Sequence, residues 1–300
     1  MKLSIVIATK DRAAYLDRAL ASLAAQRGAP PFEVIVVDNG SRDATAEVAR
    51  RHAPALDLQL VREPQPNRGR ARNAGVRAAS GTHVVFVDDD VALPAGFLAA
   101  HGRAHAERAR RGRPQAAISG PILNVPSYDD RPAPAGANYS GAFFCTCNVS
   151  VARAALERSG GFDERFDLYG WEDTELGLRL RGLGLRRAFA WPAYLYHIKP
   201  PRDETLEVVL RKTLERARMA ARLLALDGGL RATLATGAYP LNVARSRLLA
   251  PGWSLPWYAG LATSPRVGAA VRALARAQLL DGAYVAEMRR ARAALARPRG

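Results

Sequence analysis

The sequence predicts an α/β protein whose central sheet is mostly parallel and flanked by helices. Residues 1–120 alternate between apolar runs of strand length and segments with helical periodicity. The apolar runs are nearly continuous, as in sheets that helices cover on both faces. Hydrophobic residues make up 48% of the chain and charged residues 24%, which is ordinary for a packed globular protein and argues against disorder.

The first part of the chain supplies the elements of this sheet. We expect strands at residues 3–8, 32–37, 58–61 and 82–87. Helices are expected at residues 13–25, from Ser41 to about Arg51, and at residues 68–79. Ser41 is the expected N-cap of the second helix, with Asp43 in its first turn.

The later part of the chain is less regular. Residues 125–138 are rich in Pro, Gly and Asp and predict a loop over the site. The elements expected next are a strand at 143–149, helices at 153–159 and 172–181, and a strand at 187–190. From Glu204 onward we expect mostly amphipathic helix, so that residues 201–300 form a basic α-helical extension.

Polar side chains follow three of the predicted strands at the point where each strand ends. Thr9 and Asp11 follow the first, Asp38 follows the second, and Asp88-Asp89-Asp90 follow the fourth. Ligands of open α/β sheets bind beyond the carboxyl ends of the strands. The sequence therefore predicts an acidic binding site at this edge, although loops are polar in any case.

Asp88-Asp89-Asp90 is the strongest candidate for a metal site. On an extended segment the side chains of Asp88 and Asp90 face the same way, with Asp89 turned away as a spacer. A divalent cation offsets the repulsion between such carboxylates, and hard oxygen ligands suit Mg²⁺ or Mn²⁺ shared with phosphate oxygens. The alternative is a solvated acidic turn, which the buried strand immediately before it makes less favourable.

Gly170-Trp171-Glu172-Asp173 forms a second candidate group. Its carboxylates stand at the start of a predicted helix, where the helix dipole favours anions, so capping alone explains one of them. A carboxylate near a metal-bound diphosphate can also act as a general base, and Trp171 suits a platform for a sugar. Farther along stands His197, although a lone histidine is usually structural. His101 and His105 share a helix face but lack the glutamate expected between zinc-binding histidines.

The charge of the chain is uneven. The formal net charge is +16, and residues 201–300 hold 17 Arg and Lys against 7 Asp and Glu. Such an excess suits nucleic acid, an anionic membrane surface or acidic ligands. A GC-rich genome explains a preference for Arg over Lys, but it does not explain the net excess.

The two cysteines, Cys145 and Cys147, are separated by one residue. A disulfide between residues so close on a strand is badly strained, and the segment supplies no partners for a metal. We therefore expect buried thiols in a reducing cytosol. The apolar start of the chain is too short for a signal peptide, and no transmembrane helix is clear.

Six motifs follow one another along residues 1–200. They are Ser4-Ile5-Val6-Ile7-Ala8-Thr9-Lys10-Asp11-Arg12, Val36-Val37-Asp38-Asn39-Gly40-Ser41-Arg42-Asp43, Asn67-Arg68-Gly69-Arg70-Ala71-Arg72-Asn73-Ala74-Gly75, Phe86-Val87-Asp88-Asp89-Asp90, Gly160-Gly161-Phe162-Asp163-Glu164 and Trp171-Glu172-Asp173-Thr174-Glu175-Leu176. In this order they resemble the family-2 glycosyltransferases, which have the GT-A (nucleotide-diphospho-sugar transferase) fold and invert the anomeric configuration. The resemblance implies nucleotide-sugar binding by about residues 1–120 and acceptor binding and catalysis by about residues 121–200.

The resemblance also implies roles for single residues. The nucleobase and ribose would be lined by Thr9, Asp11 and Asp38, and the base or diphosphate would lie near Arg68, Arg72 and Asn73. Asp88 and Asp89 would contact the donor, and a Mn²⁺ or Mg²⁺ ion would be ligated by Asp88, Asp90 and His197. Asp173 would be the catalytic base with Glu172 as second choice, and Trp171 would bind the acceptor. The donor implied is a nucleotide-sugar, with UDP expected as its nucleotide.

Residues 201–300 lie outside the resemblance. Their positive charge, with Trp253, Trp257 and Tyr258 among prolines, predicts contact with an anionic membrane surface. We expect a cytoplasmic enzyme, or one peripheral at the inner face of the cell membrane, acting on a glycan or lipid-linked acceptor of the cell envelope. The alternative is a helical extension that packs on the core or on a second copy, and the sequence leaves the oligomeric state open.

Three rival functions have sequence arguments against them. A nucleotidyltransferase usually carries a glycine-rich phosphate loop after its first strand, whereas this chain has Thr9-Lys10-Asp11-Arg12. A nucleic-acid-binding protein would interleave aromatic residues on a basic face, and no nucleic acid is expected as a partner. A non-catalytic nucleotide-sugar binder would not need the acidic residues that this chain retains.

Overall fold

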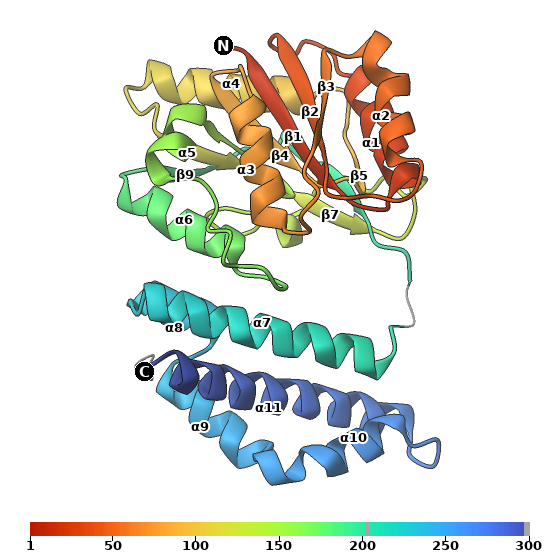
Figure 1. Ribbon diagram of the computed structural model, residues 1–300, viewed down its shortest axis with the longest axis vertical. Coiled ribbons are helices and arrows are strands. Elements are labelled where there is room, and N and C mark those ends of the chain that lie inside the picture. Colours follow the sequence, from red (N-terminus) through yellow and green to blue (C-terminus); the bar gives the residue numbers. More distant parts are fainter. Residues whose placement is uncertain (202–203, 297–300) are drawn as a thin grey trace. The chain divides into compact units, whose positions relative to one another are not determined.

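The computed structural model describes residues 1–201 and 204–296. Of the predicted segment 201–300, residues 202–203 and 297–300 therefore lie outside the described residues. The chain forms two compact units (Figure 1). Residues 1–167 and 172–201 make up the first unit. Residues 168–171 and the chain after residue 201 make up the second. The four-residue segment directly before Glu172 groups with the second unit, apart from the residues on either side of it.

A seven-stranded sheet forms the centre of the first unit, in the order β3-β2-β1-β4-β8-β6-β9. Its strands are β1 (Leu3–Thr9), β2 (Phe32–Asp38), β3 (Leu58–Arg62), β4 (His83–Val87), β6 (Ala116–Ser119), β8 (Asn148–Ala152) and β9 (Arg186–Phe189). β3, β2, β1 and β4 run parallel, β8 is antiparallel to both of its neighbours, and β6 and β9 are again parallel. The predicted mostly parallel sheet is therefore confirmed.

Helices cover both faces of this sheet. Their bounds are α1 (Ala13–Ala24), α2 (Thr45–His52), α3 (Arg68–Ala78), α4 (Phe97–Arg110), α5 (Arg153–Ser159) and α6 (Glu172–Gly182). One apolar core joins the sheet to α1, α2 and α4, and another joins it to α3, α5 and α6. α3 approaches β1 so closely that a Cβ on Gly75 would lie 2.5 Å from the side chain of Val6, so only glycine fits there.

A second sheet of three strands stands at the edge where the large sheet carries its acidic residues. Its order is β5-β10-β7, with bounds Val91–Ala92, Leu195–Ile198 and Ile122–Val125. β5 follows Asp88–Asp90 directly, so these three residues connect the two sheets. The small sheet was not expected, because a two-residue strand leaves no periodicity in the sequence.

Two predicted elements differ from the structure. α2 begins at Thr45, four residues later than expected, because Asp38 Oδ1 accepts a hydrogen bond from the Ser41 backbone and holds that segment in a turn. The strand predicted at 143–149 is wrong: β8 begins at Asn148, and the residues before it are irregular. Apolar residues in this loop, such as Phe144, are buried by packing rather than by pairing in the sheet.

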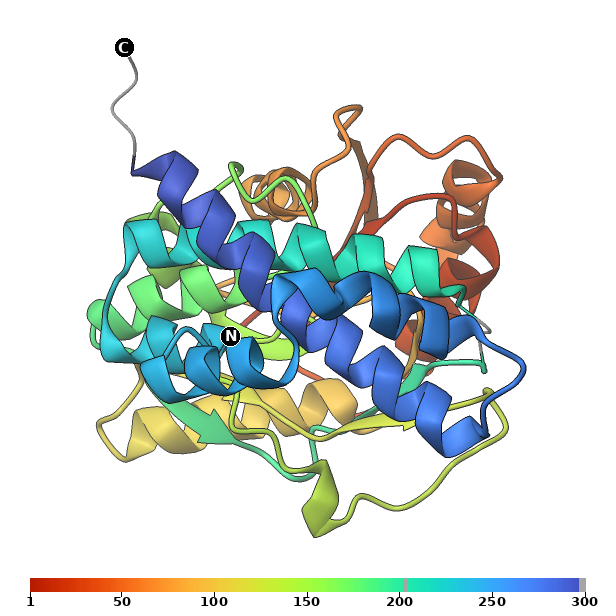
Figure 2. The same cartoon turned by 90° about the horizontal axis from the view of Figure 1, so that it is seen from below.

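The second unit is helical, as predicted. It contains α7 (Leu206–Leu226), α8 (Leu230–Thr236), α9 (Pro240–Leu249), α10 (Leu255–Thr263) and α11 (Ala269–Leu295). α7 and α11 run side by side (Figures 1 and 2) and bury Ala220 and Leu279. Glu287 of α11 bonds to Arg218 of α7 at 2.6 Å. Among the described residues, no helix is both long enough and apolar enough to cross a membrane.

Candidate functional site

The loops after β1 and β2 are tied to each other. Asp11 Oδ1 accepts a hydrogen bond from the Arg42 backbone, and the Asp11 backbone donates to Ser41 Oγ at 3.0 Å. Asp11 adopts a left-handed backbone with φ of 52°, which is strained for a residue other than glycine. Thr9 and Asp38 are register partners at the ends of neighbouring strands. The structure thus brings together the three residues predicted to line the nucleobase and ribose.

Asp89 is held by the interior of the first unit. Its Oδ2 accepts a hydrogen bond from Thr9 Oγ1 at 2.7 Å, and its Oδ1 lies 3.2 Å from Arg12 Nε. Burial raises the pKa of Asp89 to about 6, although Arg12 and Thr9 act in the opposite direction. Asp89 therefore anchors the acidic segment through contacts with Thr9 and Arg12, and its predicted contact with the donor stays a prediction.

Asp90 is surrounded by cationic groups. It lies 2.9 Å from Arg12, 3.3 Å from Lys199 and 3.0 Å from His197 Nε2. Burial alone would raise its pKa, but the contact with His197 and the charges of Arg12 and Lys199 lower it well below its ordinary value. Asp90 is therefore a buried carboxylate that stays charged. Arg12 and Lys199 were not predicted, because no motif marks them as partners of the acidic segment.

Three donor groups lie close enough to share one metal ion. Within residues 1–201 and 204–296 these are Asp88, Cys147 and His197, whose ligand atoms all lie within 4.8 Å of one another. His197 Nδ1 lies 3.1 Å from Asn124 Oδ1, and its Nε2 lies 3.0 Å from Asp90 Oδ1. Nε2 is buried and has no well-formed hydrogen bond. A carboxylate, an imidazole and a thiol are a donor set that fits a divalent cation.

Arg72 links the acidic segment to the start of α6. Its guanidinium lies 3.7 Å from Asp88, 3.0 Å from Glu172 and 3.3 Å from Asp173. Burial opposes the charge on Arg72, but the three carboxylates raise its pKa further above its already high value. Arg72 therefore stays charged and holds carboxylates from two distant parts of the chain in one group.

Asp173 is positioned on both of its oxygens. Oδ2 accepts hydrogen bonds from the backbone and the hydroxyl of Thr146, each at 2.9 Å, while Oδ1 faces Arg72. Burial and the neighbouring Glu172 raise the pKa of Asp173, although Arg72 and Thr146 act against them. A raised pKa suits a group that takes up a proton during a reaction. Thr146 was missed because it lies in the segment expected to be a strand.

Two segments of the chain match models of known protein families. Residues 4–110 match the family model described as glycosyl transferase family 2. Residues 133–200 match the model described as the N-terminal domain of galactosyltransferase. Residues 4–110 therefore belong to glycosyltransferase family 2. The predicted family is confirmed on the segment that carries the acidic residues, and the second match covers the segment with Asp173 and His197.

Curated relatives of this chain are also glycosyltransferases by name. Validoxylamine A glucosyltransferase of Streptomyces hygroscopicus subsp. limoneus is 31% identical over 68% of this chain and 53% of its own length. Chondroitin synthase of Escherichia coli is 28% identical over 67% of this chain and 35% of its own length. The chain thus spans about half, or less, of the length of these relatives.

Solved structures confirm the predicted GT-A fold. A mannosyltransferase of Pyrobaculum calidifontis, in complex with GDP-Man and Mn²⁺, superposes with a TM-score of 0.60 at 22% identity, over 98% of this chain and 88% of the other. TarS residues 1–349 of S. aureus, in complex with UDP-GlcNAc, superposes with a TM-score of 0.57 at 20% identity, over 98% and 92%. At such identity the likeness is one of fold.

Asn73 and Arg68 are the remaining residues predicted near the donor; Asn73 is buried and Arg68 is exposed. Asn73 bonds to both the N–H and the C=O of Phe162 and to Glu164, so it ties α3 to the loop before α6. Arg68 is exposed at the first position of α3. The structure therefore gives Asn73 a structural role besides the predicted one and leaves the roles of both residues as predictions.

Trp171 belongs to the second unit, not to the rim of the sheet. Its indole Nε1 donates to the Arg216 carbonyl at 2.9 Å, and the Arg216 guanidinium lies 4.9 Å from the ring centre. Trp171 has a left-handed φ of 73° directly after Gly170 at 93°. The predicted platform for an acceptor sugar is thus covered by Arg216 on one face of its ring.

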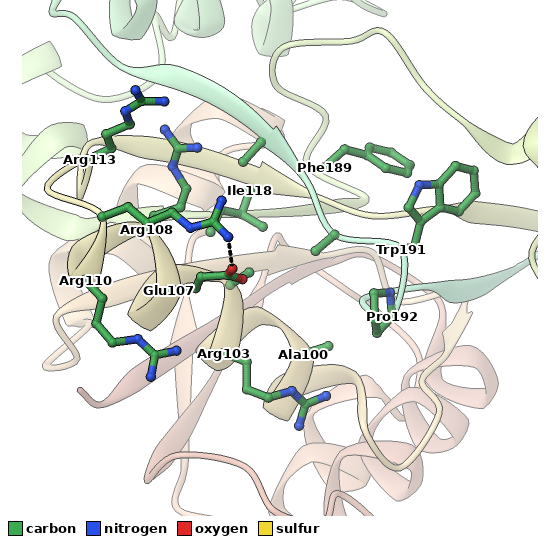
Figure 3. A pocket seen from close by; sticks show the side chains of 14 residues that line it. Ala100, Arg103, Glu107, Arg108, Arg110, Arg113, Ile118, Phe189, Trp191 and Pro192 are labelled. Carbon is green, nitrogen blue, oxygen red and sulfur yellow. Dashed lines mark hydrogen bonds and ion pairs between the residues drawn. The ribbon is translucent and has the colours of Figure 1, made fainter.

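A cavity of about 550 Å³ lies elsewhere in the first unit (Figure 3). Arginines of α4, including Arg103 and Arg108, line one side, and Phe189 and Trp191 line another. Arg108 and Arg110 stand in the last turn of α4, where positive side chains offset the helix dipole. None of the predicted site residues lines this cavity, so it is separate from the candidate site.

Proposed function

We propose that this protein is a metal-dependent, inverting glycosyltransferase. It moves a sugar from a nucleotide-sugar, with UDP as the expected nucleotide, to a hydroxyl of a glycan or lipid-linked acceptor in cell-envelope polysaccharide or glycolipid synthesis. The observation that carries the proposal is the contact of Arg72 with both Asp88 and Asp173. One guanidinium thereby joins the end of β4, where family 2 donors are expected, to a carboxylate suited to act as base.

The donor is bound at the carboxyl ends of β1, β2 and β4. Asp11 and Asp38 offer carboxylate oxygens to ribose or base, and the link between their loops fixes the distance between them. A fixed pair of acceptors suits the hydroxyls of ribose. That solved structures of the same fold hold GDP-Man or UDP-GlcNAc supports a nucleotide-sugar as donor.

The metal-binding residues in the proposal are Asp88, Asp90 and His197. Asp88 and His197 already share a cluster, and Asp90 lies 3.0 Å from the same imidazole. A divalent cation bound here supplies positive charge that stabilises the departing nucleoside diphosphate. Asn124 contacts Nδ1 of His197 and orients the ring, so that Nε2 faces the acidic segment.

Asp173 removes the proton from the acceptor hydroxyl. As the hydroxyl oxygen attacks the anomeric carbon, the bond to the diphosphate breaks and the proton passes to Asp173. A single displacement of this kind inverts the configuration at that carbon. Thr146 and Arg72 orient the carboxylate, and Glu172 is the second candidate for the base.

Transfer assays with UDP-, GDP- and dTDP-sugars, with Mn²⁺, Mg²⁺ or chelator, test the proposal. Release of nucleoside diphosphate with formation of a glycoside is the expected result, and chelator should abolish it. Formation of a nucleoside triphosphate and a sugar phosphate when pyrophosphate is added to the nucleotide-sugar would instead identify a nucleotidyltransferase. Binding of the donor without any turnover across acceptors would favour a non-catalytic binder. Activity that chelator leaves unchanged would refute the metal requirement.

Asp173→Asn tests the base. Turnover should fall by at least about a hundredfold, because general-base catalysis contributes on that order, while donor affinity stays near that of the wild type. Asp167→Asn, in the exposed loop before α6, is the matched control and should leave turnover unchanged. Normal turnover by Asp173→Asn would move the role to Glu172.

The helical unit is proposed to bind an anionic membrane surface. Exposed apolar side chains gather on α9, α10 and the turn between them: Leu241 is 78% exposed, Leu248 81%, Trp253 84% and Trp257 61%. Arg245 and Arg247 lie among them on α9. Exposed tryptophans beside arginines are the pattern of a surface that enters the headgroup region of a membrane.

Sedimentation with vesicles tests membrane binding. The protein should bind vesicles containing phosphatidylglycerol at low salt, bind less at high salt, and bind poorly to phosphatidylcholine alone. Replacement of Trp253 and Trp257 by Ser should release it. Trp191→Ser, which removes an exposed tryptophan from the first unit, is the control. A wild type that stays in solution with anionic vesicles would refute this part of the proposal, and a stable dimer would point to the alternative.

A further inference from the structure

Cys147 lies beside the acidic segment because of strand pairing. β4 and β8 are antiparallel, and Val87 pairs with Asn148 at the end of their ladder. The next residues on the two chains are Asp88 and Cys147, which leave the ladder side by side. Asp88 was predicted as a ligand and Cys147 was not, because 143–149 was expected to be one continuous strand with no metal partners.

The start of β8 is fixed by buried hydrogen bonds. The side-chain Nδ2 of Asn148 donates to the carbonyls of Pro121 and Ala193, and its Oδ1 lies 3.1 Å from His101 Nε2. His101 is itself fully buried and contacts Ser150 Oγ at 2.8 Å. This network holds the backbone at Asn148, so the position of the thiol immediately before it is set by the fold.

The third donor comes from the small sheet. His197 of β10 pairs with Val91 of β5, three residues beyond Asp88. Asp88, Cys147 and His197 thus come from three different segments, and their ligand atoms lie within 4.8 Å of one another. Donors of three chemical types converging from separate elements are unlike an acidic turn, whose carboxylates come from one segment.

We infer that Cys147 is a sulfur ligand of the metal centre, completing a carboxylate, imidazole and thiolate set with Asp88 and His197. The inference rests on the proposed metal-dependent function and goes beyond the ligands predicted for it. As the metal–sulfur bond forms, the thiol releases its proton to solvent, so the thiolate supplies the electron pair of the bond.

A sulfur ligand changes which metals the centre prefers. Mg²⁺ favours oxygen ligands in octahedral geometry, whereas thiolate favours softer ions. The centre should therefore bind Co²⁺, Zn²⁺ and Cd²⁺ better than Mg²⁺. Loss of the sulfur should narrow this difference, because Asp88 and His197 offer only oxygen and nitrogen.

Co²⁺ titration of the intact chain tests the inference without any activity measurement. Co²⁺ bound by thiolate gives a sulfur-to-metal charge-transfer band in the near ultraviolet, which nitrogen and oxygen ligands do not give. Wild type should show the band, and Cys147→Ser and Cys147→Ala should lose it and bind Co²⁺ at least about tenfold more weakly by calorimetry. Mg²⁺ in large excess should fail to displace the ion from wild type.

Cys145→Ser is the matched control. It removes a thiol two residues away that lies outside the group of three donors, so the band should persist. Near-ultraviolet circular dichroism of each variant without metal shows whether the fold is intact. His197→Gln should weaken Co²⁺ binding even where Cys147 is present.

The outcomes separate this inference from the function on which it rests. Co²⁺ binding by wild type with no charge-transfer band, or a band that survives in both Cys147 variants, would overturn the sulfur ligand and leave the proposed function standing. No Co²⁺ or Mn²⁺ binding by wild type would overturn the metal requirement itself. A band lost with Cys147 and retained in Cys145→Ser supports the inference.

Discussion

At the scale of single residues, Asp173 combines burial with three hydrogen-bond donors. Its raised pKa means that the carboxylate becomes protonated at a higher pH than an ordinary aspartate. Because a base must be deprotonated to act, turnover is full above this pKa and falls as pH drops through it. The acid limb of the kcat profile should therefore lie above the range of an unperturbed aspartate.

Thr146→Val tests which group sets this limb. The Thr146 hydroxyl donates to Asp173 Oδ2 at 2.9 Å and favours the charged form, so its loss should move the acid limb of kcat upward by roughly one pH unit. The backbone N–H of residue 146 remains as a donor, which keeps the carboxylate in place. A profile identical to that of wild type would show that Asp173 does not titrate in the rate-limiting step.

Arg72 is the residue whose loss should cost the most stability. Arg72→Met leaves Asp88, Glu172 and Asp173 without their shared cation, and uncompensated buried charges cost about 3–5 kcal/mol of the free energy of unfolding. Urea unfolding at neutral pH measures this, and the difference should shrink at acid pH as the carboxylates become protonated. Arg70→Met, which removes a more exposed pair with Glu164, is the control and should cost less than about 1 kcal/mol.

At the scale of elements, the sequence predicted the strands that carry the donor residues and missed the pieces that complete the site. β1, β2 and β4 are continuous apolar runs, so their ends and their acidic followers could be placed from the sequence. β5 and β10 are short and are held by pairing with each other. His197 was therefore predicted as a metal ligand only from the family resemblance, because the residues around it in the sequence show no metal-binding pattern.

The displaced strand β8 shows why Cys147 and Thr146 were not assigned. Phe143 and Phe144 continue the apolar pattern into 148–152, and nothing in that pattern marks where pairing starts. The start is set by Asn148, whose side chain bonds to two distant carbonyls. Such long-range bonds are not visible in a window of sequence, so the loop that supplies both residues looked like strand.

Glu33 joins the N-terminal ends of β1, β2 and β4, on the side of the sheet opposite the acidic residues. At the start of β2 its carboxylate accepts hydrogen bonds from Ser4 of β1 and from both the backbone and the hydroxyl of Ser80 before β4. Lys2 adds an ion pair at 2.9 Å. Burial alone would raise the pKa of Glu33, but these donors outweigh it and lower the pKa to about 2.

Glu33 should make the stability of the first unit depend on acid pH. Its folded-state pKa lies below the unfolded value of 4.5, so its stabilisation is complete above that value and is lost as pH falls toward about 2. Glu33→Gln should cost roughly 3 kcal/mol at neutral pH and progressively less in acid, as measured by urea unfolding. Glu157→Gln, on the surface of α5, is the control, and an equal loss in both variants would contradict the role of Glu33.

At the scale of the whole molecule, the two units divide the proposed tasks. Asp11, Asp38, Asp88, Asp173 and His197 all lie in the first unit, and the exposed apolar residues of α9 and α10 lie in the second. The sequence predicted a boundary near residue 200 from the change in pattern and charge. The grouping of Leu168–Trp171 with the helical unit was not predicted, and the bond from Trp171 to the Arg216 carbonyl is a long-range contact that a window of sequence does not show.

This division predicts that ligands stabilise one unit selectively. Three of the four tryptophans, at positions 171, 253 and 257, belong to the second unit, so tryptophan fluorescence reports mainly on that unit. Circular dichroism reports on the whole chain. A ligand that binds only the folded first unit raises the melting temperature of that unit alone. UDP with Mn²⁺ should therefore raise the melting temperature measured by circular dichroism more than the melting temperature measured by tryptophan fluorescence.

Trp191→Phe sharpens the measurement, because the remaining tryptophans then all lie in the second unit. With this variant the fluorescence transition should be nearly insensitive to UDP and Mn²⁺, while Asp38→Asn should remove the effect on circular dichroism. Equal shifts of both transitions in the Trp191→Phe protein would show that the units unfold as one cooperative system. In that case ligand binding at the acidic edge would stabilise the helical unit as well, and the two proposed tasks would be energetically coupled.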